Sequence, residues 1–414
     1  MPGYVYPNEA EVGWSLLIVL YPFITGLVAG AFVVSSLYHV FNIKSLKPVA
    51  RLSLLTALSF LLVAPLSLQA HLGRPERGFE IFLTPNFTSA MAGFGYIWLF
   101  YLLLVITEVW LVFRPDIILY AHTSSGPKRL VYQILTLGVP EMTKEARHFD
   151  EKLIKVLATI GIPAAVMLHG YVGFIFGSIK ANPWWSTPLM PVIFLLSAIV
   201  SGMALLLAMY IAITKLRGKR VDEACVRSLA QWLMAFLLID LTIEGLEVLS
   251  MAYESEESWD IVSRLIAERI PISYLGIQIF LGSFIPLVIL IALAVSQLKG
   301  EAVIRWAFLT GILVVVGVFA MRWNVVIGGQ LISKSQAGFL SYTPSLGGRE
   351  GILAALVFLL LPFYIFSTLA NLIPPWDREE EEALERGEPE PSATAAPWVS
   401  ATRVQEGLWE QEQR

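Results

Sequence analysis

Cysteine is nearly absent from this sequence, since Cys225 is the only one among 414 residues. A single thiol cannot close a disulfide within the chain. It also cannot supply the thiolates of an iron–sulfur cluster or of a cysteine-rich zinc site. Any electron-transfer metal of this kind that works with the chain must therefore be held by another protein.

Charged residues are also scarce. They form 15 % of the chain against 56 % for hydrophobic residues, and the mean hydropathy is strongly positive. A soluble domain of this size could not cover its surface with so few polar side chains. The sequence therefore predicts an integral membrane protein that is surrounded by lipid, and no nucleic acid is expected as a partner.

Long apolar stretches are what the chain has instead. As a helix, about 20 apolar residues cross the roughly 30 Å hydrocarbon layer of a bilayer. Stretches of this kind lie at 14–40, 51–70, 90–113, 153–178, 188–214, 226–252, 273–298, 303–327 and 351–373. They predict an all-α fold, a polytopic transmembrane helix bundle of about nine spans.

Lys and Arg are divided unequally between the connections. Those after the first, third, fifth and seventh spans, with the residues beside them, hold 17, whereas the N-terminal segment and the other connections hold seven. Because basic loops stay in the cytoplasm, the N-terminus is predicted outside and the C-terminus inside. The start MPGYVYPNEAEVGW lacks the basic region of a cleavable signal peptide, so the first span is expected to be retained.

Two apolar segments align without a gap, FITGLVAGAFVVSSLY (23–38) and LLSAIVSGMALLLAMY (195–210), which matches Gly30 with Gly202. A parallel duplication of four helices gives this pattern, and so does any pair of helices with small-residue packing faces. With the duplication, the predicted organisation is an exterior segment (1–13), a first four-helix bundle with the quinone site discussed below (14–178), a second four-helix bundle (179–330), an outer loop with the ninth span (331–375) and an acidic disordered cytoplasmic tail (376–414).

Three carboxyl groups interrupt the sixth span. Asp240, Glu244 and Glu247 follow one another at i, i+4 and i+7, which places them on one face of a helix. An ionisable group at mid-bilayer costs on the order of 3 kcal/mol, so this face should not meet lipid. Two interpretations stay open: the carboxyls relay protons or contact a ligand, or they pair with a cation such as Arg322 and only fix the packing.

The other polar residues of the spans are weighted toward the outer side. His39 and Glu108 fall near the inner ends of the first and third spans, and Asp240 falls near the middle. The outer half holds His71, His169, Tyr171, Arg322, Glu244 and Glu247. This distribution predicts a site that opens near the outer face, with a proton path through the carboxyls, His39 and Arg322 toward the inner side.

Haem is not expected in this chain. A bis-His haem needs two imidazoles at one depth on facing helices. Of the five histidines only His71 and His169 share the outer half, and His71 falls at the very end of its span.

The stretch HLGRPERGFEIFLTPNFTSAMAGFGYIWLFYLLL (71–104) resembles the Leu-Gly-Arg-Pro signature of the NrfD-type family, the membrane subunits of polysulfide reductases. Three further stretches are similar to its first helix, to its outer loop with the fifth helix and to the late Arg-bearing segment of its longer members: WSLLIVLYPFITGLVAGAF, GSIKANPWWSTPLMPVIFLLSAIVSG and RWNVVIGGQ. The resemblance covers residues 14 to about 330.

This resemblance implies a quinone-reactive membrane subunit that uses menaquinone or ubiquinone and carries no haem or metal, in the inner membrane of a bacterium or archaeon. It implies docking to an iron–sulfur protein of the four-cluster ferredoxin type and, through it, to a molybdopterin enzyme or a multihaem cytochrome. Polysulfide, tetrathionate and nitrite reductases and alternative complex III are built in this way.

The quinone site of the family lies near the outer face, at the start of the first helix, the end of the second and the fourth helix. By position the resemblance implies Asn8, Glu9 or Glu11, His71 with Arg74 and Arg77, and His169 with Tyr171. Some members carry a His just before the first-helix Trp, where this chain reads NEAEVGW.

Elementary chemistry supports a polar edge of this kind. A quinol that loses two electrons also loses two protons, and His is the side chain best suited to accept a proton near neutral pH. The alternative for Arg74 and Arg77 is that they only anchor the helix end at the interface. A proton-coupled transporter and a non-catalytic membrane anchor are the competing functions, and co-purification with redox subunits would discriminate between them and the quinone-reactive subunit.

Overall fold

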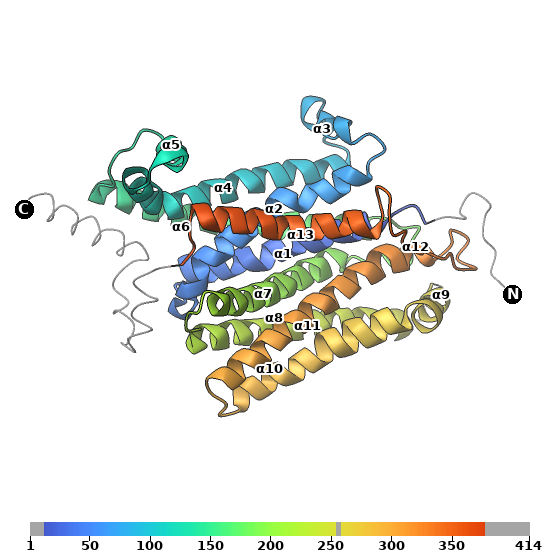
Figure 1. Cartoon of the computed structure of the whole chain (residues 1–414). Coiled ribbons are helices and arrows are strands. Elements are labelled where there is room, and N and C mark those ends of the chain that lie inside the picture. The colour runs from blue at the N-terminus through green and yellow to red at the C-terminus, as the bar shows by residue number, and fades with distance from the viewer. Residues whose placement is uncertain (1–11, 254–257, 377–414) are drawn as a thin grey trace, which may run out of the picture.

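The structure, a computed structural model, describes residues 12–253 and 258–376. Within these ranges it contains no β-strand, only an isolated bridge between Ile332 and Phe339. The long helices lie side by side along one common direction (Figure 1). Asn8, Glu9, Glu11 and the acidic tail beyond Trp376 lie outside the described residues.

Each predicted span corresponds to a long helix. The helices are α1 (Leu16–His39), α2 (Lys47–His71), α4 (Ala90–Thr123), α6 (Lys144–Gly177), α7 (Met190–Leu216), α8 (Glu223–Tyr253), the π-helical η5 (Ile272–Phe284) continued by α10 (Ile285–Val295), α11 (Glu301–Trp323) and α13 (Ile352–Leu372). Eight helices of the described chain are long and apolar enough to cross a membrane. The predicted sixth span, α8, is not among these eight, but it runs the length of the bundle as a helix of 31 residues.

Short helices mark the two ends of the bundle. One end carries α3 (Glu80–Leu83), α9 (Trp259–Arg264) and α12 (Gly329–Leu331), and we call it the α3 end. The opposite end carries α5 (Gly126–Leu135) and is called the α5 end. The remaining short elements are η2 (Lys44–Leu46), η3 (Pro75–Arg77), η4 (Leu265–Arg269) and η6 (Asn324–Gly328).

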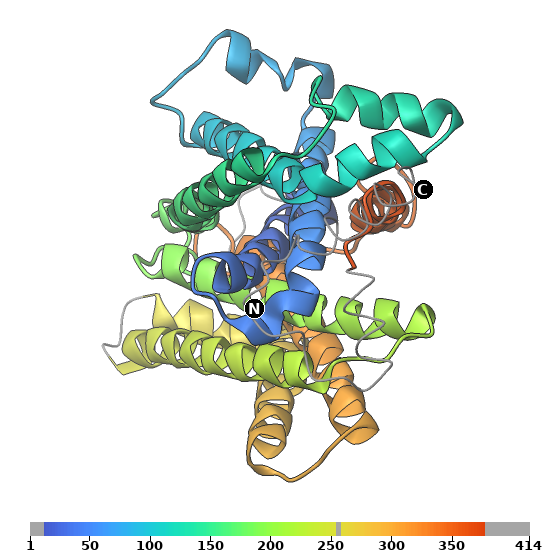
Figure 2. The same cartoon turned by 90° about the vertical axis from the view of Figure 1, so that its left-hand side faces the viewer.

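Helix α1 is the centre of the bundle. Seen from the α5 end, it is surrounded by other helices (Figure 2), and it contacts α2, α6, α7, α11 and α13. Its closest crossing is with α7, where the backbones of Gly30 and Gly202 meet. A Cβ atom at Gly30 would lie only 2.3 Å from the carbonyl oxygen of Ile199, so no larger residue fits there.

The peripheral helices present apolar side chains to the outside. On α13 the exposed fractions are 57 % for Leu353, 63 % for Val357 and 54 % for Leu360. Such a face needs an apolar surrounding, because water would not tolerate a patch of this size on a monomer. The exposed apolar faces therefore agree with a multi-pass membrane protein.

Helices α4 and α6 are longer than the spans predicted for them, with 34 residues each. The apolar stretch of α4 stops at Arg114, but the helix continues through Pro115 to Thr123. Ion pairs carry the charges of this extension: Arg114 Nη1 lies 2.8 Å from Asp150 of α6, and Asp116 pairs with Arg51 of α2. Paired charges can thus continue a helix beyond the point at which hydropathy ends.

Candidate functional site

At the α3 end, the start of α1 is fixed by the loop before α7 and by α12. The backbone N–H of Trp14 donates to Oε1 of Gln330 at 2.9 Å. The indole of Trp14 stacks on that of Trp185 at 5.2 Å, and Nε1 of Trp185 donates to the carbonyl of Val325 at 2.6 Å. Gly329 leaves the room for Trp185, since a Cβ there would lie 2.2 Å from its Nε1. The Pro-Trp-Trp loop and the RWNVVIGGQ segment therefore build one structure.

His71 ends α2 beside this structure. Its Nδ1 lies 3.1 Å from Oε1 of Glu350 and 3.5 Å from Oγ of Ser15, the residue before α1. The loop that brings Glu350 is held in place by Arg349, which donates to the carbonyl of Leu72. The imidazole is half-buried and Glu350 is exposed by 39 %. A His paired with a carboxylate at the rim of a bundle is a ready proton acceptor.

Arg74 and Arg77 do not join His71. Arg74 is exposed, and Arg77 forms two hydrogen bonds with Glu80, at 2.7 and 2.8 Å. Because Arg77 donates to it, the pKa of Glu80 is lowered below its ordinary value. The two arginines belong instead to a projecting segment between α2 and α4, whose exposed apolar residues are Leu72, Phe79, Leu83, Phe87 and Met91 (Figure 1).

His169 lies deeper in the bundle. It is exposed by only 2 %, and its Nε2 has no hydrogen-bond partner among the described residues. It precedes Phe176, which packs on Trp14, by seven residues along α6 and so sits about 10 Å farther in. Tyr171 is half-buried, and its ring centroid lies 5.4 Å from that of Phe174. No hydrogen bond in the described chain connects His71 with His169.

Arg322 is buried in the centre of the second half. Its Nη2 donates to Oγ of Ser197 at 2.8 Å and to the carbonyl of Phe194 at 3.3 Å, and its guanidinium lies 4.1 Å from the centroid of the Phe194 ring. The described residues contain no ion pair between Arg322 and Asp240, Glu244 or Glu247. The cation is therefore held by α7, and the packing alternative that pairs it directly with the carboxyls of α8 finds no such contact.

The three carboxyls of α8 differ in their surroundings. Asp240 is buried, and its Oδ1 has no hydrogen-bond partner among the described residues. Glu244 accepts a hydrogen bond from Nε2 of Gln278 at 3.1 Å. The amide of Asn324 donates to Gln278 at 2.9 Å, and Ser273 donates to Asn324 at 2.6 Å. A polar chain thus leads from the carboxyl face into η5 and η6.

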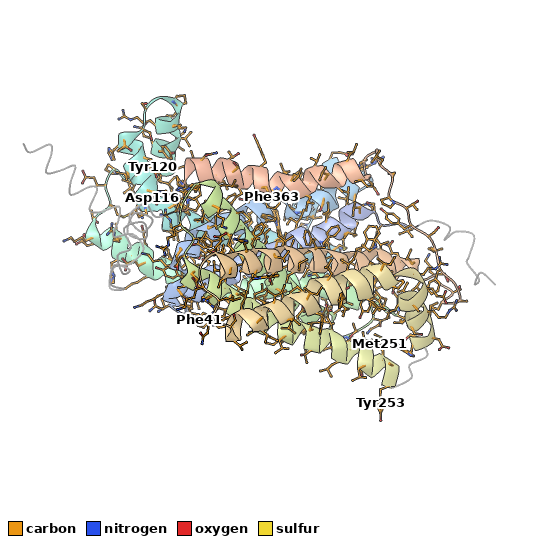
Figure 3. All side chains as sticks on the ribbon, turned by 60° about the horizontal axis from the view of Figure 1, so that its bottom comes forward. Phe41, Asp116, Tyr120, Met251, Tyr253 and Phe363 are labelled. Atoms are coloured by element: carbon orange, nitrogen blue, oxygen red, sulfur yellow. The ribbon has the colours of Figure 1, made fainter. Side chains whose placement is uncertain are left out.

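Glu244 and Glu247 line a pocket at the α3 end between α7, α8, η5 and α11. Apart from the two carboxyls, its lining residues are Pro183, Trp184, Thr187, Met190, Ile193, Val248, Met251, Tyr274, Gln278, Met321, Asn324 and Val325. Figure 3 shows Met251 at the end of the bundle opposite Asp116 and Tyr120.

Toward the α5 end, Glu108 is fully buried, and neither of its carboxyl oxygens has a hydrogen-bond partner in the described part of the chain. The same holds for Nε2 of His39 and for the hydroxyl of Tyr101. These groups lie on α1 and α4, so they belong to the first half of the chain, whereas Asp240 belongs to the second. No three of His, Cys, Asp and Glu in the described residues form a group that could hold a metal ion.

Sequence reasoning missed Glu350, Gln278, Asn324 and Trp184. Glu350 stands in an outer loop without a motif, and its role depends on contact with a distant His71. Gln278 and Asn324 are uncharged and so do not stand out in apolar helices, although a buried amide in a span is itself a signal of a polar contact. Trp184 stands out in the sequence only as part of the Pro-Trp-Trp resemblance.

Comparison with known proteins identifies the family. A family model described as polysulphide reductase, NrfD, matches residues 5–334. The chain is 30 % identical over 397 residues to the C-type membrane component of selenate reductase from Mesobacillus selenatarsenatis, which covers 91 % of this chain and 89 % of that protein. It is 30 % identical over 281 residues to a putative dimethyl sulfoxide reductase membrane protein of Halobacterium salinarum, which covers 67 % and 61 %.

A third relative is the Hdr-like menaquinol oxidoreductase integral membrane subunit of Archaeoglobus fulgidus, 26 % identical over 391 residues that cover 91 % of this chain and 88 % of that protein. The family model spans the start of α1, the His71 edge and the segment of Arg322, so the resemblance noted in the sequence is confirmed over most of the chain. The chain belongs to the NrfD family of polysulphide reductase membrane proteins.

Proposed function

We propose that this chain is the quinone-interacting membrane subunit of a respiratory oxidoreductase complex. It exchanges electrons between the quinone pool and an iron–sulfur partner that docks at the α3 end. The relatives named as parts of selenate reductase, dimethyl sulfoxide reductase and menaquinol oxidoreductase support this proposal, since each name describes part of a redox complex.

The pair of His71 and Glu350 is the observation that carries the proposal. The imidazole stands at the rim, where α1, α2 and the loop before α13 meet. A bound quinol, menaquinol or ubiquinol, supplies two electrons and two protons. His71 is placed to accept a proton at the ring nitrogen that faces the head group, and Glu350 stabilises the resulting imidazolium. Ser15 fixes the ring from the side of α1.

The partner is assigned by the same end of the molecule. The chain contributes one cysteine, so the acceptor of the electrons must be a metal centre of another subunit. The projecting segment with Arg74, Arg77 and its exposed apolar side chains offers it a surface. A four-cluster ferredoxin-type protein, followed by a molybdopterin or multihaem subunit, is the proposed partner. The α3 end then faces the exterior and the α5 end the cytoplasm.

A proton path is the proposed role of the buried polar groups. Asp240, Glu244, Glu247 and Arg322 hold polar positions in the second half, and Glu108 with His39 continues toward the α5 end in the first. His169 and Tyr171 connect the rim with the interior at intermediate depth. Each of these positions can bind a proton or a hydrogen-bonding water in a region that excludes other charge.

Purification of the tagged chain from its membrane tests the proposal. Co-purification of an iron–sulfur subunit, together with quinol oxidation or quinone reduction by the isolated complex, is the expected result. A chain that purifies alone and neither binds nor turns over a quinone contradicts it. A proteoliposome assay without any redox partner identifies a transporter if solute accumulates with a proton gradient.

A further inference from the structure

The pocket lined by Glu244, Glu247 and Trp184 is separate from the His71 edge. His71 is surrounded by residues of α1, α2 and the loop before α13, whereas the pocket is formed by α7, α8, η5 and α11. The two sites are joined by consecutive residues of one loop. Trp185 stacks on Trp14 next to the His71 edge, while Trp184 lines the pocket, where its ring lies 5.7 Å from that of Tyr274.

The pocket has an unused hydrogen-bond donor. Nε1 of Trp184 is buried and has no partner among the described residues, although an indole N–H in an apolar region normally finds one. Facing it in the same lining are the carboxyls of Glu244 and Glu247, and that of Glu244 is oriented by Gln278 at 3.1 Å. A donor and two acceptors therefore converge on a cleft whose other side chains are largely apolar.

Irregular backbone surrounds this pocket. Tyr274 and Gln278 lie in η5, and Asn324 and Val325 lie in η6, both of which are π-helical. A π-helix is less favourable than an α-helix and occurs mostly at functional sites. Here it directs the amides of Gln278 and Asn324 toward each other and toward Glu244, as their hydrogen bonds show. The local geometry is therefore built around the polar groups of the pocket rather than around regular packing.

The lining selects the chemistry of the ligand. Met190, Ile193 and Val248 offer contacts to an apolar ring, and the aromatic faces of Trp184 and Tyr274 offer stacking. Among the described lining residues there is no Lys or Arg, which disfavours the phosphate of a lipid head group. A flat ring with an oxygen that accepts from Trp184 and a hydroxyl that donates to a carboxylate satisfies every polar group. Quinones and quinols are membrane-soluble molecules with this pattern.

Access from the lipid is available on the same side. Beside the pocket, Leu246 and Leu249 of α8 are exposed by 52 % and 61 %, and Leu275 of η5 by 49 %. A molecule with an apolar tail can leave this tail in the bilayer while its head group enters between the two helices.

We infer that this pocket is a second quinone-binding site, distinct from the one at the His71 edge. The inference rests on the proposed function. It assigns Trp184 as the donor to a quinone oxygen and Glu244 with Glu247 as the acceptors from a quinol hydroxyl. The adjacent Trp184 and Trp185 then form the wall between the two sites.

Photolabelling of the intact complex in lipid nanodiscs with an azido-quinone tests the inference. Labelled peptides from the wild type are expected in two groups, one near His71 and one from α8 or residues 183–193. Trp184→Phe keeps the aromatic ring but removes the donor, and it should reduce the second group about tenfold, as loss of one hydrogen bond to a buried partner does, while the first group keeps its intensity.

Two substitutions near the end of α8 serve as a matched pair. Met251→Trp fills the pocket lining and should abolish the second group, whereas Tyr253→Trp changes a side chain that is exposed by 87 % and should leave both groups intact (Figure 3). Labels near His71 alone in the wild type overturn the second site but not the proposed function. An absence of label from the whole chain overturns the proposed function itself. Equal labelling of the pocket in wild type and both pocket variants shows a non-specific lipid contact and also overturns the second site.

Discussion

His71 and Glu350 show how a functional pair can be assembled from residues far apart in the chain. The resemblance to the family singled out His71, but nothing in the sequence of the loop before α13 pointed to Glu350. The pairing arises because α13 lies beside α2 and returns the preceding loop to the α3 end. A polar residue in such a loop carries no periodicity, so only the packing of the helices reveals its partner.

At this pair we predict that Glu350→Gln slows quinol oxidation by the purified complex about tenfold or more, because the amide no longer stabilises a protonated His71. His71→Ala should slow it further, and the two changes together should cost little more than His71→Ala alone, since they remove one interaction. The measurement is steady-state quinol oxidation by complexes that retain all their partner proteins.

The control for this pair lies at the other end of the molecule. His148 and Glu151 form a similar contact at 3.8 Å in α6, with His148 exposed by 68 %. His148→Ala should leave quinol oxidation unchanged. Equal activities of wild type and His71→Ala would remove His71 from the site.

Asp240 carries a second prediction at this scale. Its Oδ1 is buried without a partner among the described residues, so Asp240→Asn preserves the shape of the residue but removes the ability to hold and release a proton. We expect impaired proton uptake or translocation by the complex in liposomes, with quinone binding much less affected. Unchanged proton movement and unchanged turnover would reduce the carboxyl face of α8 to a packing network.

At the scale of elements, the helices themselves could be predicted because the membrane requires long apolar stretches. Their ends could not, where charge pairs such as Arg114 with Asp150 extend a helix past its apolar part. The π-helical character of η5 and η6 also left no trace in the sequence. It depends on hydrogen bonds between Gln278 and Asn324, two residues on different helices.

The crossing of α1 and α7 gives a prediction about packing. Gly30→Ala should strongly reduce the yield and thermal stability of the folded protein, because the new Cβ would meet backbone atoms of α7 that cannot rotate away. Gly245→Ala on α8 is the matched control, since a Cβ there meets nothing within 4 Å, and replacement of a helical glycine by alanine is neutral or stabilising. Equal melting temperatures for the two variants in detergent would contradict the close contact.

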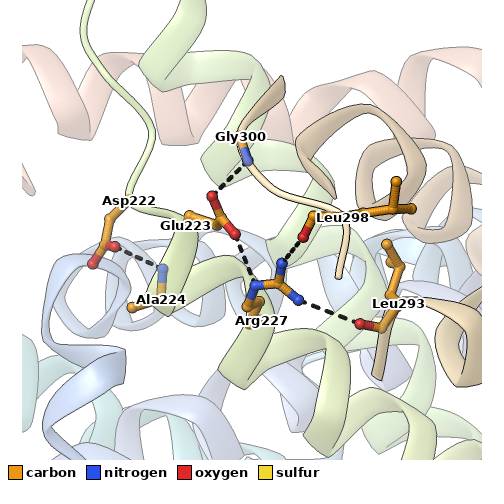
Figure 4. Close-up of polar contacts among 7 residues, drawn as sticks. All are labelled: Asp222, Glu223, Ala224, Arg227, Leu293, Leu298 and Gly300. Carbon is orange, nitrogen blue, oxygen red and sulfur yellow. Dashed lines mark hydrogen bonds and ion pairs between the residues drawn. The ribbon is translucent and has the colours of Figure 1, made fainter. Parts of the chain in front are cut away.

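The start of α8 is fixed to the connection between α10 and α11. Glu223 accepts from the backbone N–H of Gly300 at 2.6 Å and from Nε of Arg227 at 2.8 Å, and Arg227 also donates to the carbonyls of Leu293 and Leu298 (Figure 4). The hydrogen bond from Gly300, and then those of Arg227, lower the pKa of Glu223. This contact closes the α5 end of the second half.

We therefore predict that Glu223→Gln lowers the melting temperature at neutral pH, by an amount that corresponds to at most about 1 kcal/mol for a partly exposed group. A lowered folded-state pKa means that the carboxylate stabilises the fold above the ordinary pKa of Glu, and that this contribution disappears as the pH falls through the lower folded-state value. The melting temperatures of wild type and variant should thus converge in acid. A difference that stays constant from pH 7 to acid would show that charge is not involved.

At the scale of the whole molecule, Gly30 and Gly202 connect the fold with its predicted duplication. The two positions align in the sequence repeat, and in the structure they meet each other at the crossing of α1 and α7. Equivalent residues of two copies meet in this way when the copies are related by an axis that passes between them. The division into a first bundle (14–178) and a second bundle (179–330) stays a prediction, which this contact supports.

The orientation of the bundle is the last prediction, and the single cysteine makes it simple to test. In a Cys225→Ser background, Thr84→Cys at the α3 end and Ser125→Cys at the α5 end both place a thiol outside the long apolar stretches. With the basic connections in the cytoplasm, a membrane-impermeant maleimide added to intact cells should label position 84 and not position 125, and lysis should expose both. The same labelling should fall at position 84 when the iron–sulfur partner is bound, because the projecting segment is its proposed docking surface. Labelling of position 125 alone would place the α3 end in the cytoplasm, so that quinone, partner and proton release would all have to be assigned to the opposite side of the membrane.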